Sequence, residues 1–127
     1  MDKEMELGFQ VDRQHDVAIV RCAGRMVRGT ALDVFRRQVE QLEQVRILIM
    51  DLAAIEQVDA GGLGSLLLIR RWARQHSVQM KLVNPSPFVM RLLESTRLTS
   101  VFEVSSLEEA LCILQAPRDG RQQYAVA

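Results

Sequence analysis

The sequence predicts an α/β fold in which about four helices pack against a mixed sheet of four to five strands. Two short strand-like segments near the start, joined by a polar link, suggest an antiparallel hairpin. Apolar segments of strand length and of helix length then alternate along the rest of the chain. This strand–helix–strand order implies parallel strands joined by right-handed crossovers.

Length and composition are those of a single globular domain. The chain has 127 residues, of which 48% are hydrophobic and 25% are charged, enough for a proper core. Its 16 basic and 16 acidic residues give zero net charge, which argues against binding to duplex DNA. No apolar run reaches the roughly 20 residues of a membrane span, and residues 1–9 do not resemble a signal peptide. We therefore expect a cytoplasmic protein without membrane insertion.

The residues that most often build metal and redox sites are few and scattered. Cys22 and Cys112 each lie in an apolar segment, as expected of reduced core thiols in a cytosolic protein. His15 and His76 are isolated from each other, whereas a metal site needs closely spaced ligands. The sequence therefore predicts no metal, no cofactor and no catalytic residue.

The first half of the chain supplies the predicted hairpin, a helix and a buried strand. Residues 7–11 and 17–22 form the hairpin, and Gly24 and Gly29 bracket a loop. Thr30 is the expected N-cap of a helix over residues 31–43, whose apolar stripe has spacings of three and four residues: Leu32, Phe35, Val39 and Leu42. The continuous apolar run 46–52 predicts a strand buried on both faces, followed by a loop over residues 53–58.

The second half continues the alternation. It predicts helix, strand, helix and strand over residues 63–76, 78–83, 87–95 and 101–104. Ser106 and Glu109 form a capping box, so a fourth helix starts there and ends before Pro117. We expect a domain over residues 1–116 and a mobile tail over residues 117–127. The residues expected in the core include Leu48, Met50, Leu66, Leu67 and Val83.

Two aspartates and a glycine cluster stand out between the buried strand and the next helix. Asp51 is expected to organise the following loop by accepting backbone hydrogen bonds, and Asp59 to fix the turn or cap the helix. The cluster Asp59–Gly64 reads Asp-Ala-Gly-Gly-Leu-Gly. It lacks the Lys-Ser/Thr ending of a P-loop, so it indicates a tight strand-to-helix turn and not a nucleotide-hydrolysing site. Weak anion binding stays open.

This arrangement resembles the central signature of STAS domains, the family of the anti-sigma-factor antagonists. In that family a buried strand ends in Asp-Leu and is followed by Asp-Ser-Ser-Gly-Leu-Gly or a close variant. Here Asp51-Leu52 and Asp59–Gly64 occupy these places, and the resemblance extends over roughly residues 7–114. It implies a STAS-like fold and a non-enzymatic interaction module. The implied partner is an anti-sigma factor or a histidine-kinase-like ATP-binding protein.

The sequence departs from the family at its switch. In relatives, phosphorylation of a serine directly before Gly-Leu-Gly switches partner binding off. Gly61 takes that place here and Ala60 precedes it, so neither offers a hydroxyl. Ser65, one turn later, is expected near the same surface, as a substitute phosphorylation site, a small contact residue or a tolerated helix position. The resemblance thus implies a binding module without the usual phosphorylatable serine.

A partner surface is expected where three loops meet at one end of the sheet, because loops at the carboxyl ends of parallel strands gather there. The loops cover residues 25–29, 59–65 and 84–86. Val27 stands where the family often has an acidic residue. The predicted contact residues are Arg25, Val27, Arg28, Asp59, Gly62, Leu63, Gly64, Ser65 and Asn84.

Other functions stay open at this point. A scaffold subunit of a signalling assembly, or the STAS component of a lipid-transport ATPase system, fits the loss of the switch serine, because constitutive binding suits both roles. The run Arg70–Arg74, which contains Trp72, suits a solvated helix face better than a nucleic-acid surface. A small enzyme is disfavoured because no nucleophile–base pair is evident. The sequence leaves a homodimer open.

Overall fold

A computed structural model describes residues 6–115 of the chain, with side chains up to Leu111. The predicted tail 117–127 and the side chain of Cys112 lie outside the described residues. In chain order the elements are β1 (Gly8–Gln14), β2 (Val17–Met26), α1 (Thr30–Glu40), β3 (Ile47–Val58), α2 (Ala60–Gln75), β4 (Gln79–Val83), α3 (Pro87–Ser95), β5 (Glu103–Ser105) and α4 (Leu107–Gln115).

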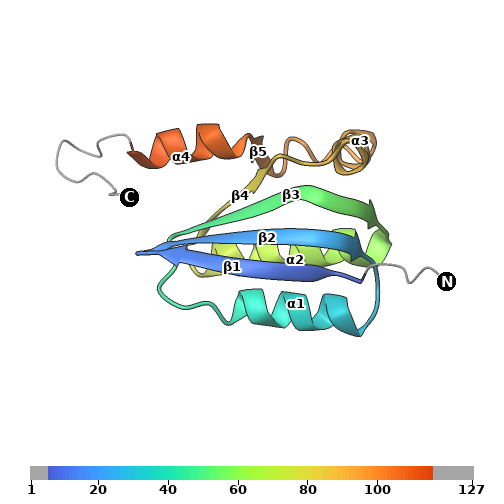
Figure 1. Ribbon diagram of the computed structural model, residues 1–127, viewed down its shortest axis with the longest axis horizontal. Coiled ribbons are helices and arrows are strands. Elements are labelled where there is room, and N and C mark those ends of the chain that lie inside the picture. The colour runs from blue at the N-terminus through green and yellow to red at the C-terminus, as the bar shows by residue number, and fades with distance from the viewer. Residues whose placement is uncertain (1–5, 116–127) are drawn as a thin grey trace.

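The strands form one mixed sheet in the order β1-β2-β3-β4-β5. β1 pairs with β2 in antiparallel fashion, and the three remaining pairs are parallel. Helices α1 and α2 lie side by side over one face of the sheet (Figure 1). The predicted hairpin, parallel crossovers and α/β class are confirmed.

β3 is longer than the sequence predicts. It runs from Ile47 to Val58, so the expected loop 53–58 is strand. Its pairing with β2 shifts between Arg21 and Ala23, and again between Gly24 and Arg25, with an extra residue on β3 each time. Such bulges bend and twist a strand. Gly24, expected in a loop, lies in β2 with a φ of 104° beside the second shift.

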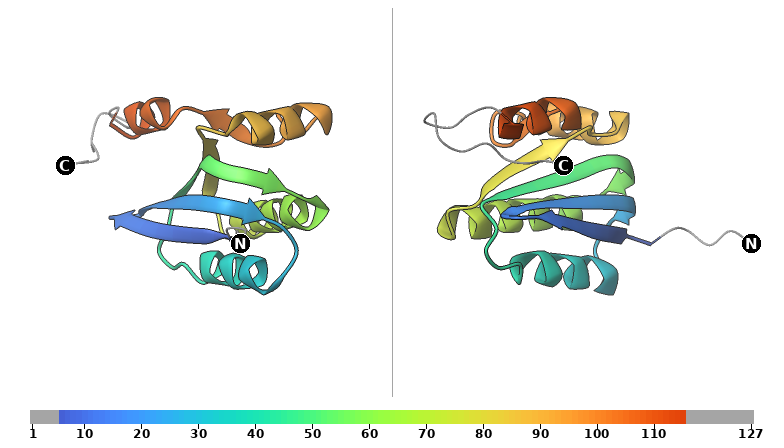
Figure 2. Two further views of the ribbon diagram at one scale, coloured as in Figure 1. Left: turned by 45° about the vertical axis from the view of Figure 1, so that its right-hand side comes forward. Right: turned by 60° about the vertical axis from the view of Figure 1, so that its left-hand side comes forward.

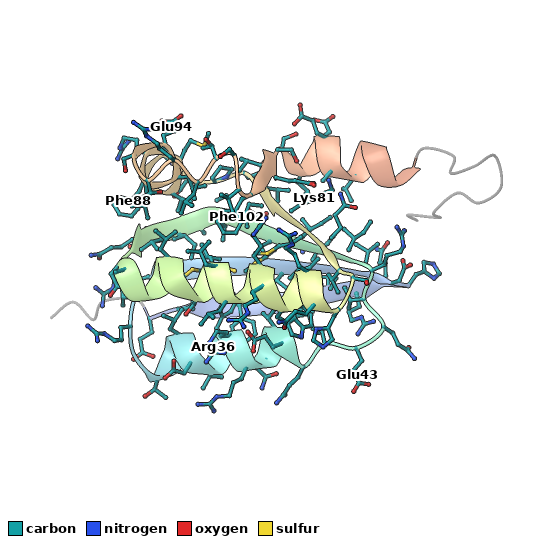
Figure 3. All side chains as sticks on the ribbon, turned by 180° about the vertical axis from the view of Figure 1, so that it is seen from behind. Arg36, Glu43, Lys81, Phe88, Glu94 and Phe102 are labelled. Carbon is teal, nitrogen blue, oxygen red and sulfur yellow. The ribbon has the colours of Figure 1, made fainter. Side chains whose placement is uncertain are left out.

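The core lies on both faces of the sheet. The larger cluster fills the space between the sheet and α1 and α2, and Phe102, just before β5, is buried in it (Figure 3). Residues that alternate with it along the strands make a smaller cluster with α4 on the other face: Val17, Ile47, Ile49, Val83 and Ala110. Figure 2 shows α3 and α4 along the edge of the sheet that β4 and β5 form.

Burial confirms four of the five predicted core residues and contradicts the fifth. Leu48, Met50, Leu66 and Val83 are each at most 1% exposed, but Leu67 is 37% exposed. Three leucines follow one another at 66–68, and a helix turns only one of them directly toward the sheet. That residue is Leu66.

Side-chain caps fix most helix starts. Asp59 caps α2, and the predicted capping box at α4 is confirmed, with Ser106 Oγ accepting from the Glu109 amide and Glu109 Oε1 accepting from the Ser106 amide. The predicted cap of α1 is wrong. Thr30 is already helical, and Gly29, which has no side chain, is the N-cap.

Candidate functional site

Asp59 joins the end of β2 to the start of α2. Its Oδ1 accepts a hydrogen bond from the Gly62 amide at 2.8 Å, and its Oδ2 accepts one from the Arg28 amide at 3.1 Å. Its own amide donates to the Met26 carbonyl at 3.3 Å. The loop after β2 and the first turn of α2 are therefore held together as one unit, which we call the Asp59 junction.

The hydrogen bonds at this junction also set the charge of Asp59. The Gly62 amide, followed by the Arg28 amide, holds the pKa of the carboxyl below its ordinary value. Burial acts in the opposite direction, and the Arg28 charge adds to the lowering. Because a carboxylate is already favoured at neutral pH, the cap is ionised there.

Gly62 lies at the closest contact of the junction. A Cβ atom added to it would lie 1.8 Å from the Met26 carbonyl oxygen and 3.0 Å from Cγ1 of Val58. Gly62 is buried, so the structure gives it a packing role, and its predicted contact with a partner stays a prediction. Its lack of a side chain lets the helix start pack directly on the ends of β2 and β3.

The outer side of the helix start is flat. Ala60 is exposed, and a Cβ on Gly64 would meet nothing within 4 Å. A Cβ on Gly61 would instead lie 3.0 Å from the Arg28 Cβ. The Arg28 side chain thus lies over Gly61. Leu63 is half-buried and packs against the larger core cluster.

Ser65 does not reach this surface. It is 7% exposed and belongs to the buried side of α2. The expectation that it lies near the partner surface is therefore wrong. Its small side chain fits the helix against the sheet.

Asn84 does not join this surface either. Val83 pairs with Asp51, whereas the Asp59 junction lies beyond Val58, at the far end of β3. The Asn84 Oδ1 accepts from the Leu107 amide at 3.2 Å, so the side chain holds the start of α4. The structure thus brings together the loops at 25–29 and 59–65, whereas in the third predicted loop Asn84 turns toward α4 and Ser86 donates a hydrogen bond to the Ile55 carbonyl of β3 at 2.7 Å.

A hollow of about 400 Å³ lies beside the Asp59 junction, between the start of the chain and α1. It is lined by Glu6, Leu7, Arg25, Val27, Arg28, Gly29, Thr30 and Ala31. The Arg25 Nη1 donates to Oε1 of Gln57 at 3.4 Å, whereas Arg28 is exposed. The sequence identified the two arginines and Val27, but it gave no sign that Leu7 would form the opposite wall.

Comparison with known families decides the classification. The STAS domain family matches residues 8–110. The chain belongs to the STAS domain family. The predicted resemblance to STAS domains is therefore confirmed.

Solved anti-sigma factor antagonists share the fold. The Bacillus protein SpoIIAA in its unphosphorylated form is 21% identical, with a TM-score of 0.70 over 82% of this chain and 93% of that one. An antagonist from Mycobacterium paratuberculosis is 18% identical, with a TM-score of 0.73 over 87% and 96%. A putative antagonist from Thermotoga maritima is 19% identical, with a TM-score of 0.72 over 85% and 95%.

Asp51 and Cys22, two residues that could in principle react, are held by a hydrogen bond and by burial. Asp51 Oδ1 accepts from the Ala53 amide at 3.0 Å, as expected, and pairs in the sheet far from the Asp59 junction. Burial, and secondarily the charge of Asp51, raises the pKa of the Cys22 thiol to about 12. Among the described residues no group of three or more His, Cys, Asp or Glu is placed to hold a metal, and no helix is long and apolar enough to cross a membrane.

Proposed function

We propose that this STAS domain is a non-enzymatic regulatory module that binds an anti-sigma factor or a histidine-kinase-like ATP-binding protein. The Asp59 junction carries the proposal, because it presents the loop after β2 and the flat start of α2 as one rigid surface. Membership of the family and the fold shared with solved anti-sigma factor antagonists support it.

Binding fits the chemistry of the junction better than catalysis does. The Asp59 carboxylate is occupied by two backbone amides, and a depressed pKa makes it a weak general base. Cys22 is buried with a raised pKa, so its thiol stays protonated and unreactive. The described residues therefore offer a preformed contact surface rather than an acid–base or nucleophilic site.

Ala60 and Gly61 favour a second candidate, a scaffold that binds constitutively. Neither residue has an oxygen that a kinase could phosphorylate. The STAS domain of a SulP transporter from Vibrio cholerae also shares the fold, at 15% identity and a TM-score of 0.61 over 80% of this chain and 83% of that one. A subunit of a signalling assembly or of a lipid-transport ATPase system would use the same surface.

Affinity capture from the native lysate, with the captured protein identified by mass spectrometry, tests the proposal. We expect the wild-type chain to capture an anti-sigma or kinase-like ATP-binding protein. Gly64→Arg should lose it with the melting temperature unchanged, because the position faces open space. Gln75→Arg adds the same side chain at the other end of α2 and should still capture it. Capture of a transporter ATPase would favour the scaffold, and capture by Gly64→Arg would contradict the proposed surface.

A further inference from the structure

Arg28 presents a positive charge at the Asp59 junction. Its backbone is fixed by the Asp59 carboxylate, and its Cβ lies over Gly61. Within residues 6–115 its guanidinium forms neither a hydrogen bond nor an ion pair, although its charge lowers the pKa of Asp59. The Asp59 oxygens are taken up by backbone amides, so the group that faces outward with donors to offer is the guanidinium.

Leu67 and Leu68 extend this surface along α2. They are 37% and 45% exposed. Among the exposed large hydrophobic residues of the described chain, these two are adjacent in sequence. Leu68 lies seven residues after Gly61 and therefore on the same helix face, about 10 Å further along the axis. Gly64, between them, leaves open space above the helix. The Arg28 guanidinium and the apolar patch of Leu67 and Leu68 thus lie on either side of the open surface at Gly64.

The charges around the surface between Arg28 and Leu68 favour a partner segment that carries a negative charge. The first turn of α2 contains no acidic residue, and the carboxylate of its N-cap Asp59 accepts hydrogen bonds from the backbone amides of Gly62 and Arg28. Arg25 adds a second positive charge on the adjoining hollow, where Gln57 holds it. Glu6 is the acidic residue on the lining of that hollow, and it is exposed at its edge.

We propose that the partner segment that docks here places a carboxylate on Arg28, over Gly61, and an aliphatic side chain on Leu67 and Leu68, about 10 Å further along the helix axis. This rests on the proposed function and specifies the chemistry of the partner. A carboxylate forms strong, often bidentate hydrogen bonds with a guanidinium, and apolar contact beside it excludes water. Partners that present a basic side chain to Arg28 are rejected by like-charge repulsion.

The probe is a short peptide with the required spacing. In an extended chain, side chains two and four residues apart lie on the same side, at about 7 and 13 Å, so acetyl-Ala-Glu-Ser-Leu-Ala-Leu-amide presents its carboxylate and both leucines to one surface at separations that bracket about 10 Å. Its control is the same peptide with Gln in place of Glu. Each is titrated at low salt into isotope-labelled full-length protein, and amide signals are followed by NMR. We expect the Glu peptide to shift Val27, Gly61, Gly64 and Leu68, and the Gln peptide to bind about tenfold more weakly.

Variants separate this contact from general attraction to a charged surface. Arg28→Ala should weaken binding of the Glu peptide about tenfold, and Leu68→Ser should weaken both peptides. Arg91→Ala removes an exposed arginine from α3 and should change nothing. Equal binding of both peptides, or shifts elsewhere, would overturn the inference. So would concentration-dependent shifts of the same amides without peptide, which would assign the surface to a second copy of the chain.

This test does not depend on affinity capture. If the peptide binds as expected and no regulatory partner is captured, the proposed function fails and the surface chemistry stands. If a partner is captured equally well by wild type and Arg28→Glu, the function stands and this inference fails.

Discussion

A Cβ atom on Gly62 would lie 1.8 Å from the carbonyl oxygen of Met26. Two heavy atoms that are not bonded never approach this closely, so main chain packs on main chain at this point. The same carbonyl accepts a hydrogen bond from the Asp59 amide. The candidate surface is therefore fixed by backbone atoms, which explains how it remains in place without support from large side chains.

Gly62→Ala should destabilise the fold. The methyl group meets backbone that cannot rotate away, so we expect the free energy of unfolding to fall by about 1–3 kcal/mol or more, measured by urea unfolding. Gly64→Ala is the matched control, because its methyl group enters open space. It should leave stability unchanged or raise it by up to about 1 kcal/mol through helix propensity. Equal stability of the two variants would contradict the close packing at Gly62.

Asp59→Ala should reduce stability in a pH-dependent way. Loss of the cap lowers the free energy of unfolding by about 1 kcal/mol near neutral pH. Because the folded pKa of Asp59 is depressed, the carboxylate contributes fully above its unfolded pKa of about 3.9. Its contribution is lost as pH falls through the lower folded pKa. Urea midpoints from neutral to acidic pH should therefore converge for wild type and variant, and a constant gap would show that the charge plays no part.

Leu66 and Leu67 should respond very differently to truncation. Leu66 is 1% exposed and Leu67 37% exposed. We expect Leu66→Ala to lower the free energy of unfolding by about 2–5 kcal/mol and Leu67→Ala to change it by about 0.5 kcal/mol. Urea unfolding of both variants measures the difference. A larger loss for Leu67→Ala would mean that α2 is turned the other way on the sheet.

Sequence rules succeeded where a structure depends on neighbours along the chain. The Asp59 cap and the Ser106–Glu109 capping box each involve residues within one helical turn, and both are confirmed. The buried strand and the apolar helix faces also follow from local periodicity. Hence the fold class and the location of the junction could be predicted from the sequence.

The features that the sequence did not predict depend on contacts between distant segments. After Leu52, the buried residues of β3 are Ile55 and Val58, a spacing of three that the two bulges impose, so the alternation expected of a strand is absent. Asn84 lies away from the Asp59 junction because β4 is much shorter than β3 and ends beside the middle of it. Close approach of Gly62 to Met26 likewise needs the packed structure. None of these features has a signal within a single segment.

The chemistry at the helix start bears on regulation. Ala60 and Gly61 carry no hydroxyl, and Ser65 is 7% exposed on the side of α2 that faces the sheet. A kinase could reach that hydroxyl only after the helix start unfolded, which the Asp59 and Gly62 contacts oppose. A phosphate there would also bring nearly two negative charges into an apolar environment.

We therefore expect no phosphorylation of the helix start, and intact-mass spectrometry after incubation with ATP and the captured partner measures it. The control is Gly61→Ser, which places a hydroxyl at the half-buried helix start. Gly61 has a helical backbone that serine can adopt, but the new Cβ would lie 3.0 Å from the Arg28 Cβ, so the Arg28 main chain has to move by a few tenths of an ångström. If the partner is a kinase that docks here, this variant should gain one phosphate while wild type gains none. A stoichiometric phosphate mapped to Ser65 of the wild-type chain would contradict both the burial of that residue and the constitutive surface.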